Sequence, residues 1–294
     1  MRVTVKVAAT TANLGPGYDA LGLALSVGSE FTFEHAAAFS ITGCPSAYAS
    51  EDNLCWVAFK RVYALAGVKE LPAVHIHIDS HVPVARGLGS SSTCVVAGVL
   101  AANAFLGQPY GEDELFQILN ELEGHPDNAA AALYGGLTAS FVHEGRAIAV
   151  RCPVASRWRF VAIIPNYEVS THEARRLLKT EVPLKNAVFN LSHTVAVVKA
   201  LELGDEALLG IACEDTLHQP LRKPLIPEYD DVQAIALSQG ASAFMISGSG
   251  STMLAVAGEE ATAERIAAAI SKAYPHFGTM VLEADSHGAR VTID

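Results

Sequence analysis

The sequence is short of positive charge. It has 20 Lys and Arg residues against 31 Asp and Glu residues, which gives a formal net charge of -11. Non-specific binding to nucleic acid, or to an anionic membrane surface, requires a basic face on the protein. The composition therefore argues against nucleic acid and membranes as partners.

The chain also lacks a long apolar run. Its longest apolar stretch follows Ser92 and covers about a dozen residues, whereas a membrane-spanning helix needs about 20. The N-terminal segment MRVTVKVAATTANLG has no apolar core of the kind that signal peptides carry. The cysteines are odd in number and form no CxxC pair, which favours reduced thiols in a cytoplasmic protein; they are Cys44, Cys55, Cys94, Cys152 and Cys213.

Period-two alternation of apolar residues predicts several β-strands. Half of the 294 residues are hydrophobic, enough for one large domain or two medium ones. The expected strands cover residues 2–8, 30–35, 73–79, 137–143, 147–152 and 159–165, with a strand-turn-strand unit over 241–257 and two further strands at the end of the chain.

Segments whose apolar residues have helical spacing lie between these strands, at irregular intervals. The expected helices cover residues 53–67, 91–105, 111–124, 126–134 and 261–274, and residues 170–240 are mostly helical. Strands and helices are mixed in both halves without strict alternation, which favours an α+β fold. A soft boundary at residues 152–158 divides the chain into domains 1–155 and 156–294.

The stretch GLGSSS, residues 87–92, has the features of a phosphate-binding loop but no lysine. It is not the GxxxxGK[ST] loop of the P-loop proteins, and serine replaces the last glycine of the dinucleotide-binding pattern GxGxxG. Gly87 and Gly89 would still let a phosphate approach the backbone, and the helix after them would present free N–H groups. The alternative is an ordinary glycine turn with a serine cap.

Three stretches, taken in order, resemble the motifs of the GHMP kinase superfamily. They are ATTANLGPGYDALGLAL (residues 9–25), PVARGLGSSSTCVVAG (83–98) and ISGSGSTMLAV (246–256). Together they span most of the chain, so the resemblance is specific. It implies a GHMP kinase fold, with an N-terminal ribosomal-protein-like α+β domain, a C-terminal ferredoxin-like α+β domain and the active site between them.

Other segments are similar to those of the homoserine kinase family within this superfamily. They are LGPGYDALGLAL, which has Tyr18 where Phe is usual, EGHPDNAAAALYGGL (123–137), VSTHEARRLL (169–178) and EDTLHQPLR (214–222). This resemblance implies ATP-dependent phosphorylation of the side-chain hydroxyl of L-homoserine in threonine biosynthesis, and it is compatible with a homodimer. The alternatives are another small alcohol as acceptor (threonine, shikimate or mevalonate) or a catalytically silent nucleotide-binding module.

The resemblance also implies how ATP and Mg²⁺ are held. Mg²⁺ prefers oxygen ligands, and the family pattern assigns it to Ser91 and Glu123, with Glu121 as the alternative carboxylate. Asn53 is the candidate for hydrogen bonding to the nucleotide base. The remaining candidates for ATP binding form one run: Pro83, Val84, Ala85, Arg86, Gly87, Leu88, Gly89, Ser90, Ser91, Ser92 and Thr93.

The same resemblance assigns the substrate site, where arginines suit a carboxylate and acidic or amide oxygens suit an ammonium. The expected substrate-binding residues are Asn13, Asp19, His125, Asp127, Arg175 and Arg222, and the catalytic ones are Asp127, Asn128 and Arg175. Asp127 would lie in the first turn of a helix, where its charged form is stabilised and it is a weak base. Our hypothesis is that Asp127 and Asn128 orient the acceptor hydroxyl while the γ-phosphate itself takes the proton.

Overall fold

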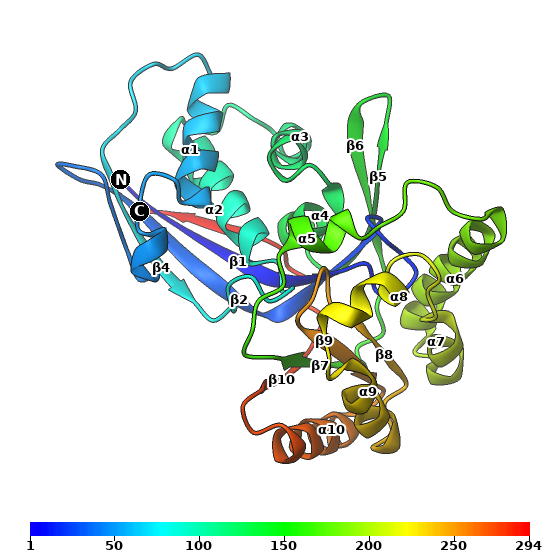
Figure 1. Ribbon diagram of the computed structural model, residues 1–294. Coiled ribbons are helices and arrows are strands. Elements are labelled where there is room, and N and C mark those ends of the chain that lie inside the picture. The colour runs from blue at the N-terminus through cyan, green and yellow to red at the C-terminus, as the bar shows by residue number, and fades with distance from the viewer.

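The computed structural model describes residues 1–294 and contains two β-sheets with helices packed against them (Figure 1). The first sheet has seven strands in the order β11-β1-β2-β4-β3, with β5 paired to both β2 and β6. Its strands are β1 (Arg2–Ala12), β2 (Leu21–His35), β3 (Ser40–Thr42), β4 (Val74–Ser80), β5 (Leu137–His143), β6 (Arg146–Cys152) and β11 (Arg290–Ile293).

Four helices cover one face of the first sheet (Figure 1). They are α1 (Leu54–Leu65), α2 (Ser90–Phe105), α3 (Glu112–Glu123) and α4 (Pro126–Tyr134). Helix α2 is buried almost all round between β1 and the other three helices, which explains why its sequence is apolar on every side. Gly98 allows this packing, because a Cβ there would overlap the backbone oxygen of Cys55 in α1.

The second sheet is antiparallel, with the order β10-β7-β9-β8. Its strands are β7 (Arg159–Ile164), β8 (Ala243–Ile246), β9 (Met253–Ala257) and β10 (Gly278–Leu282). Helices α9 (Tyr229–Ser238) and α10 (Glu260–Ala273) pack on one face and form a core of their own with it.

The opposite face of the second sheet packs against the first part of the chain. Trp158, Phe160 and Met245 share a core with Leu21 and Leu23 of β2, and this core also includes Ala200 and Leu209 from two later helices. The remaining helices of the second half are α5 (Thr171–Arg176), α6 (Leu184–Leu203), α7 (Glu206–Ala212) and α8 (Gln219–Arg222), with a short 3₁₀ turn at Lys223–Leu225. One continuous apolar contact therefore joins the two sheets.

The α+β class is confirmed, but several strands differ from their predictions. Strand β1 continues to Ala12, beyond the predicted residue 8, and β3 was not predicted. Strand β2 begins at Leu21, well before the predicted 30–35, because residues 21–25 are buried between α4 on one face and the second sheet on the other and so do not alternate. Strand β11 leaves the second half of the chain and pairs with β1. The division at residue 155 stays a prediction.

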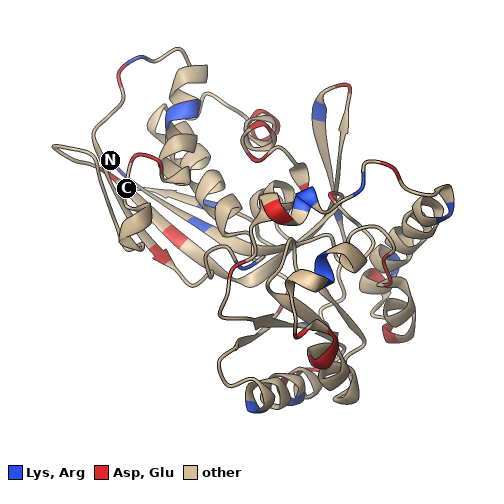
Figure 2. Cartoon of the chain, in the orientation of Figure 1, with Lys and Arg blue, Asp and Glu red and all other residues tan.

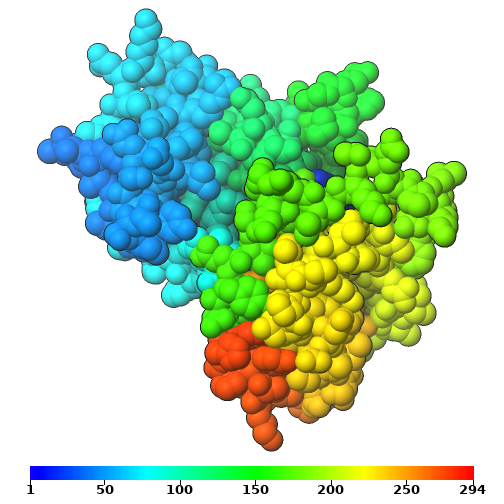
Figure 3. Space-filling view, viewed as in Figure 1, coloured from blue at the N-terminus to red at the C-terminus, as the bar shows by residue number.

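The segment around α5 lies over the junction of the two halves, as the green residues of Figure 3 show. Basic positions on α5 and α8 lie near each other at the centre of the molecule, whereas others are scattered (Figure 2). None of the helices combines the length and apolar character needed to cross a membrane.

Substitution of Gly22 tests whether β2 must approach α4 closely. A Cβ at this residue would overlap the backbone oxygen of Asp127 at the start of α4. We expect Gly22→Ala to lower the free energy of unfolding by about 1–3 kcal/mol, because the helix must shift to make room. Gly278→Ala is the control, since its Cβ would make only ordinary contacts with Ile164. Equal unfolding midpoints in urea for the two variants would contradict this account.

Candidate active site

A cavity of about 1130 Å³ lies at the junction of the two halves. Its lining combines the loop that contains Asn13 and Asp19, residues 43–54, the glycine loop with the start of α2, the start of α4, residues 168–175, and Arg222 with residues 248–249, together with Phe31 of β2 and Ile78 and Ser80 of β4. Segments that are far apart in sequence thus share one hollow, large enough for a nucleotide and a small molecule together.

The glycine loop enters α2 as the sequence predicts. The first helical hydrogen bond runs from the N–H of Thr93 to the carbonyl of Gly89, so the N–H groups of residues 90–92 have no acceptor within the helix. The hydroxyl of Ser90 accepts from the N–H of Ala85 at 3.2 Å and closes the loop. These free N–H groups and the positive end of α2 suit a phosphate.

Gly87 and Gly89 adopt positive φ angles of 79° and 67°. A Cβ at Gly89 would overlap the side chain of Thr10, and one at Gly87 would overlap the carbonyl of Ser247. The two glycines therefore serve the packing of the loop against β1 and the β8–β9 turn, in addition to any approach by a ligand.

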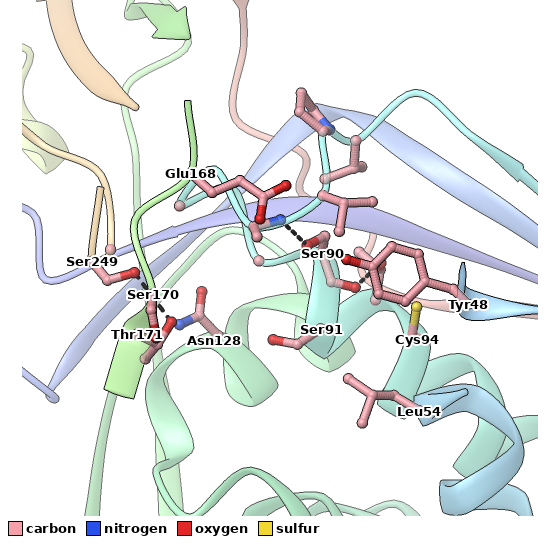
Figure 4. Close-up of a pocket in the computed structure, with 18 of the residues that line it drawn as sticks. Tyr48, Leu54, Ser90, Ser91, Cys94, Asn128, Glu168, Ser170, Thr171 and Ser249 are labelled. Carbon is pink, nitrogen blue, oxygen red and sulfur yellow. Dashed lines mark hydrogen bonds between the residues drawn. The ribbon is translucent and has the colours of Figure 1, made fainter. Parts of the chain in front are cut away.

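Ser91 and Ser92 point in different directions. Ser91 is exposed and lines the cavity, where Figure 4 shows it near Ser90 and Asn128. Ser92 is buried, and its hydroxyl donates to the Oε2 of Glu123 at 2.7 Å. Burial raises the pKa of the Glu123 carboxyl, and the hydrogen bond from Ser92 opposes that rise. Glu121 instead pairs with Arg61 of α1, so the structure gives the alternative carboxylate no place at the loop.

Not every residue of the run 83–93 turns its side chain to the cavity. Leu88 is fully buried in the core. The guanidinium of Arg86 donates to the carbonyls of Pro165 and Asn166 and pairs with Glu168 at 3.1 Å. With Ser92 turned to Glu123, any contact of these three residues with a nucleotide would use backbone atoms.

Arg175 and Asp19 are brought together. The Nη1 and Nη2 atoms of Arg175 donate to the two carboxylate oxygens of Asp19 at 3.0 and 2.8 Å, and Nη1 also donates to the hydroxyl of Tyr18 at 2.8 Å. Two parallel N–H···O bonds make this a strong and well-oriented ion pair. The Tyr18 hydroxyl explains why Tyr fits where Phe is usual.

Arg222 approaches the same ring from α8. Its guanidinium carbon lies 5.1 Å from the centre of the Tyr18 ring, and that of Arg175 lies 5.7 Å away. The side chain of Arg222 is buried, and its Nη1 donates to the carbonyl of Gly248 at 3.0 Å. The structure therefore gathers Asp19, Arg175 and Arg222 at one end of the cavity.

Asn13 has a structural role at the cavity edge. Its Oδ1 accepts from the N–H of Asp19 at 3.0 Å, and its Nδ2 donates to the carbonyl of Gly248 at 2.9 Å. Asn13 and Asp19 both have positive φ angles, which non-glycine residues adopt at a cost and mostly at functional sites. The amide thus holds the loop that presents the Asp19 carboxylate.

A chain of hydrogen bonds links the start of α4 to β1. His125 donates from Nδ1 to Asp127 at 2.8 Å, and the same carboxylate oxygen accepts from the N–H of Asn128 at 2.7 Å. The Oδ1 of Asn128 in turn accepts from the hydroxyl of Thr10 at 2.7 Å. Pro126 occupies the first position of the helix, as predicted. His125, Asp127 and Asn128 all line the cavity.

The other end of the cavity is less polar. Tyr48, Leu54 and Cys94 line it (Figure 4), and such a surface suits a flat nucleotide base. Asn53 also lines this end, but its amide caps α1: Oδ1 accepts from the N–H of Cys55 and Nδ2 donates to the carbonyl of Tyr48. The prediction that Asn53 hydrogen-bonds the base therefore gains no support from its side chain.

Several lining residues were missed from the sequence. Figure 4 shows Glu168, Ser170, Thr171 and Ser249 around the cavity, with the hydroxyls of Thr171 and Ser249 3.2 Å apart. They lie in loops or, for Thr171, at the start of α5, where no periodicity predicts the direction of a side chain. Tyr18 lies inside the first motif, and its departure from Phe was the only available signal.

The family comparisons agree with this geometry. Residues 53–136 match the GHMP kinases N terminal domain and residues 197–276 match the GHMP kinases C terminal domain, together more than half of the chain. A crystal structure of mevalonate kinase shares the fold, with a TM-score of 0.71 at 13% identity over 97% of this chain and 99% of the other. The chain belongs to the GHMP kinases.

Relatives with higher sequence identity indicate which family of GHMP kinases this is. The chain is 40% identical over 259 residues to the homoserine kinase of Clostridium beijerinckii, covering 88% of this chain and 87% of the relative, and 39% identical to that of Trichormus variabilis, covering 98% of each. The crystal structure of homoserine kinase from Cytophaga hutchinsonii gives a TM-score of 0.86 at 29% identity over 99% and 97% of the two chains. Within the GHMP kinases, it is a member of the homoserine kinase family.

The His125–Asp127 hydrogen bond predicts a pH effect. This bond raises the pKa of the His125 imidazole above its ordinary value of 6.5, against the opposing effect of burial. Because folding favours protonated His125, this group contributes its full stabilisation below pH 6.5. The contribution is lost as the pH rises through the pKa that His125 has in the folded state. We expect Asp127→Asn to lower the His125 pKa in an NMR titration and to destabilise the fold more below pH 6.5 than well above it. An unchanged His125 titration, with the exposed His143 as internal reference, would exclude the coupling.

Proposed function

We propose that this protein transfers the γ-phosphate of ATP to the side-chain hydroxyl of L-homoserine, giving O-phospho-L-homoserine for threonine biosynthesis. The observation that carries the proposal is the charge arrangement of Asp19, Arg175 and Arg222 in one cavity. A free amino acid carries a carboxylate and an ammonium, and this arrangement offers a partner for each.

The charges also weigh against the other acceptors. Shikimate and mevalonate have a carboxylate but no ammonium, so Asp19 would lose a partner. L-Threonine has both charges, but its hydroxyl lies one carbon nearer to them, so it would sit further from the start of α4. A silent nucleotide-binding module would have no need of Asp127, which is buried yet lines the cavity.

Asp127 and Asn128 are proposed to orient the acceptor hydroxyl. One carboxylate oxygen of Asp127 already accepts two hydrogen bonds, from His125 and from the N–H of Asn128. These bonds hold the carboxylate in one orientation, with its second oxygen free to accept from a hydroxyl. This supports a mechanism in which the carboxylate positions the hydroxyl and the phosphate takes the proton, as phosphoryl transfer allows. Arg175, next to Asp19, would fix the acceptor carboxylate.

The residues at the start of α2 fit a magnesium ion. Ser91 offers a hydroxyl in the cavity, whereas Glu123, at the end of α3, does not line it. The Glu123 carboxylate is held next to the loop through Ser92, and its Oε1 makes no bond to that serine. No group of three or more His, Cys, Asp and Glu side chains forms a metal site, so Mg²⁺ would complete its shell with phosphate oxygens and water. When bound, the ion would neutralise charge on the phosphates.

The wider proposals follow from the family. We assign the enzyme to the cytoplasm, as a homodimer with neither nucleic acid nor membrane as a partner, and we place its two domains at residues 1–155 and 156–294. Its cofactors would be ATP and Mg²⁺.

The acceptor is tested by ADP release from Mg²⁺-ATP with L-homoserine, L-threonine, mevalonate and shikimate. We expect L-homoserine to exceed L-threonine in kcat/KM by at least about tenfold, the discrimination that one displaced carbon usually provides. Turnover with mevalonate or shikimate alone would refute the proposed acceptor. Binding of ATP without turnover of any acceptor would identify the silent module.

The two serines make a matched pair for testing the metal site. We expect Ser91→Ala to lower kcat/KM for Mg²⁺-ATP by at least about 100-fold, because a metal ligand is worth several kcal/mol of charge stabilisation. Ser92→Ala would keep both proposed ligands but remove the hydrogen bond that orients the Glu123 carboxylate. We therefore expect kcat/KM to fall about tenfold. The reverse order of the two losses would show that Ser92, rather than Ser91, binds the ion.

A further inference from the structure

Arg222 is held in an unusual way for a buried cation. Its side chain is only 2% exposed, and no carboxylate lies within ion-pair distance of it. Both hydrogen bonds of the guanidinium are made by Nη1, to the carbonyl of Gly248 at 3.0 Å and to the Nδ1 of His218 at 3.4 Å. Its Nε is buried without a partner. The Nε–Nη2 edge thus makes no hydrogen bond within the protein, and its planar geometry matches that of a carboxylate.

His218 is fully buried, and its ring is fixed from several sides. The Nε2 donates to the carbonyl of Gly15 at 2.7 Å, and the ring centre lies 5.3 Å from that of Tyr18. Because Nε2 carries the proton, Nδ1 has a free lone pair that faces the Nη1 of Arg222. Burial lowers the pKa of the imidazole, so the ring is neutral and can accept this bond.

Asp215 completes the arrangement beneath His218. Its carboxylate is fully buried and accepts from the N–H groups of Leu217, His218 and Gln219 and from the amide of Asn190. These bonds hold the turn that begins α8, the helix that contains Arg222. The Oδ2 also lies 3.5 Å from the Nε2 of His218, which favours the proton on that nitrogen.

We propose that the Asp215–His218 pair positions Arg222, so that the Nε–Nη2 edge of its guanidinium faces the carboxylate of the acceptor. His218 is a positioning residue that would not touch the substrate. The inference rests on the proposed function only in requiring an acceptor with a carboxylate. It goes beyond that function because it explains how a guanidinium with no carboxylate partner keeps one orientation.

Two substitutions of His218 separate its two hydrogen bonds. In His218→Asn the amide oxygen can occupy the place of Nδ1 and accept from Arg222, while the bond to Gly15 is lost. In His218→Gln the amide nitrogen can reach the carbonyl of Gly15, while the acceptor for Arg222 is lost. His143→Gln, at an exposed site on β5, is the matched control.

The readouts are kcat and the separate KM values for L-homoserine and ATP. We expect His218→Gln to raise the KM for L-homoserine about tenfold, the usual worth of one hydrogen bond to a charged group. We expect its kcat and its KM for ATP, and every constant of His218→Asn, to stay within about threefold of wild type. A purely structural role for His218 would raise both KM values, and would do so in both variants.

The coupling to Arg222 is tested in a double-mutant cycle. Lysine has no bidentate edge to orient, so His218→Gln added to Arg222→Lys should raise the KM for L-homoserine by less than about twofold further. A full tenfold further increase would overturn the proposal. So would a tenfold rise in His218→Asn alone, which decides the matter even if His218→Gln does not fold.

A failure of the proposed function can be distinguished from a failure of the positioning role of His218. Wild-type protein is assayed first with the acceptor panel, and if another acceptor with a carboxylate is used, the same variants are compared with that acceptor. Wild-type turnover with equal KM values for all His218 variants would overturn the positioning role and leave the kinase function intact.

Discussion

The contact of the glycine loop with its two neighbours is the constraint on which the site depends. Gly89 lies against Thr10 of β1, and Gly87 lies against Ser247 at the end of β8. The hydroxyl of Ser247 lies within hydrogen-bonding distance of the carbonyl of Gly87 and of the hydroxyl of Thr11. A side chain at Gly87 or Gly89 would displace the loop from these neighbours. The same closeness brings residues 13–19 and 248–249 to the cavity beside the start of α2.

The fold could be predicted further from the sequence than the site could. Alternation and helical spacing predict most elements, because they reflect burial on one face of a strand or helix. They failed for the start of β2, where both faces are buried, and they say nothing of the partner of β11. Pairing between distant strands is decided by tertiary packing, which leaves no local pattern.

Within the site, the motifs predict which segments meet but not which way a side chain points. Ser91 and Ser92 have the same chemistry, yet adjacent residues lie about 100° apart on a helix, so one faces the cavity and the other faces Glu123. Arg86 stands in the phosphate loop by sequence, but carbonyls at residues 165–166 draw its guanidinium away. Such choices depend on partners far along the chain.

The charges of the cavity suit ATP, which is an anion, and a zwitterionic amino acid, although the protein as a whole is acidic. The basic side chains that line the cavity are Arg175 and Arg222, both at the acceptor end, together with the titratable His125. The Asp19–Arg175 pair is neutral overall, so Arg222 supplies the net positive charge that attracts a carboxylate. No lysine lines the phosphate end, and the guanidinium of Arg86 pairs with Glu168 instead. In the proposed mode of binding, the helix dipole, the free N–H groups and a divalent cation balance the triphosphate, so nucleotide affinity depends on the cation proposed at Ser91 and Glu123.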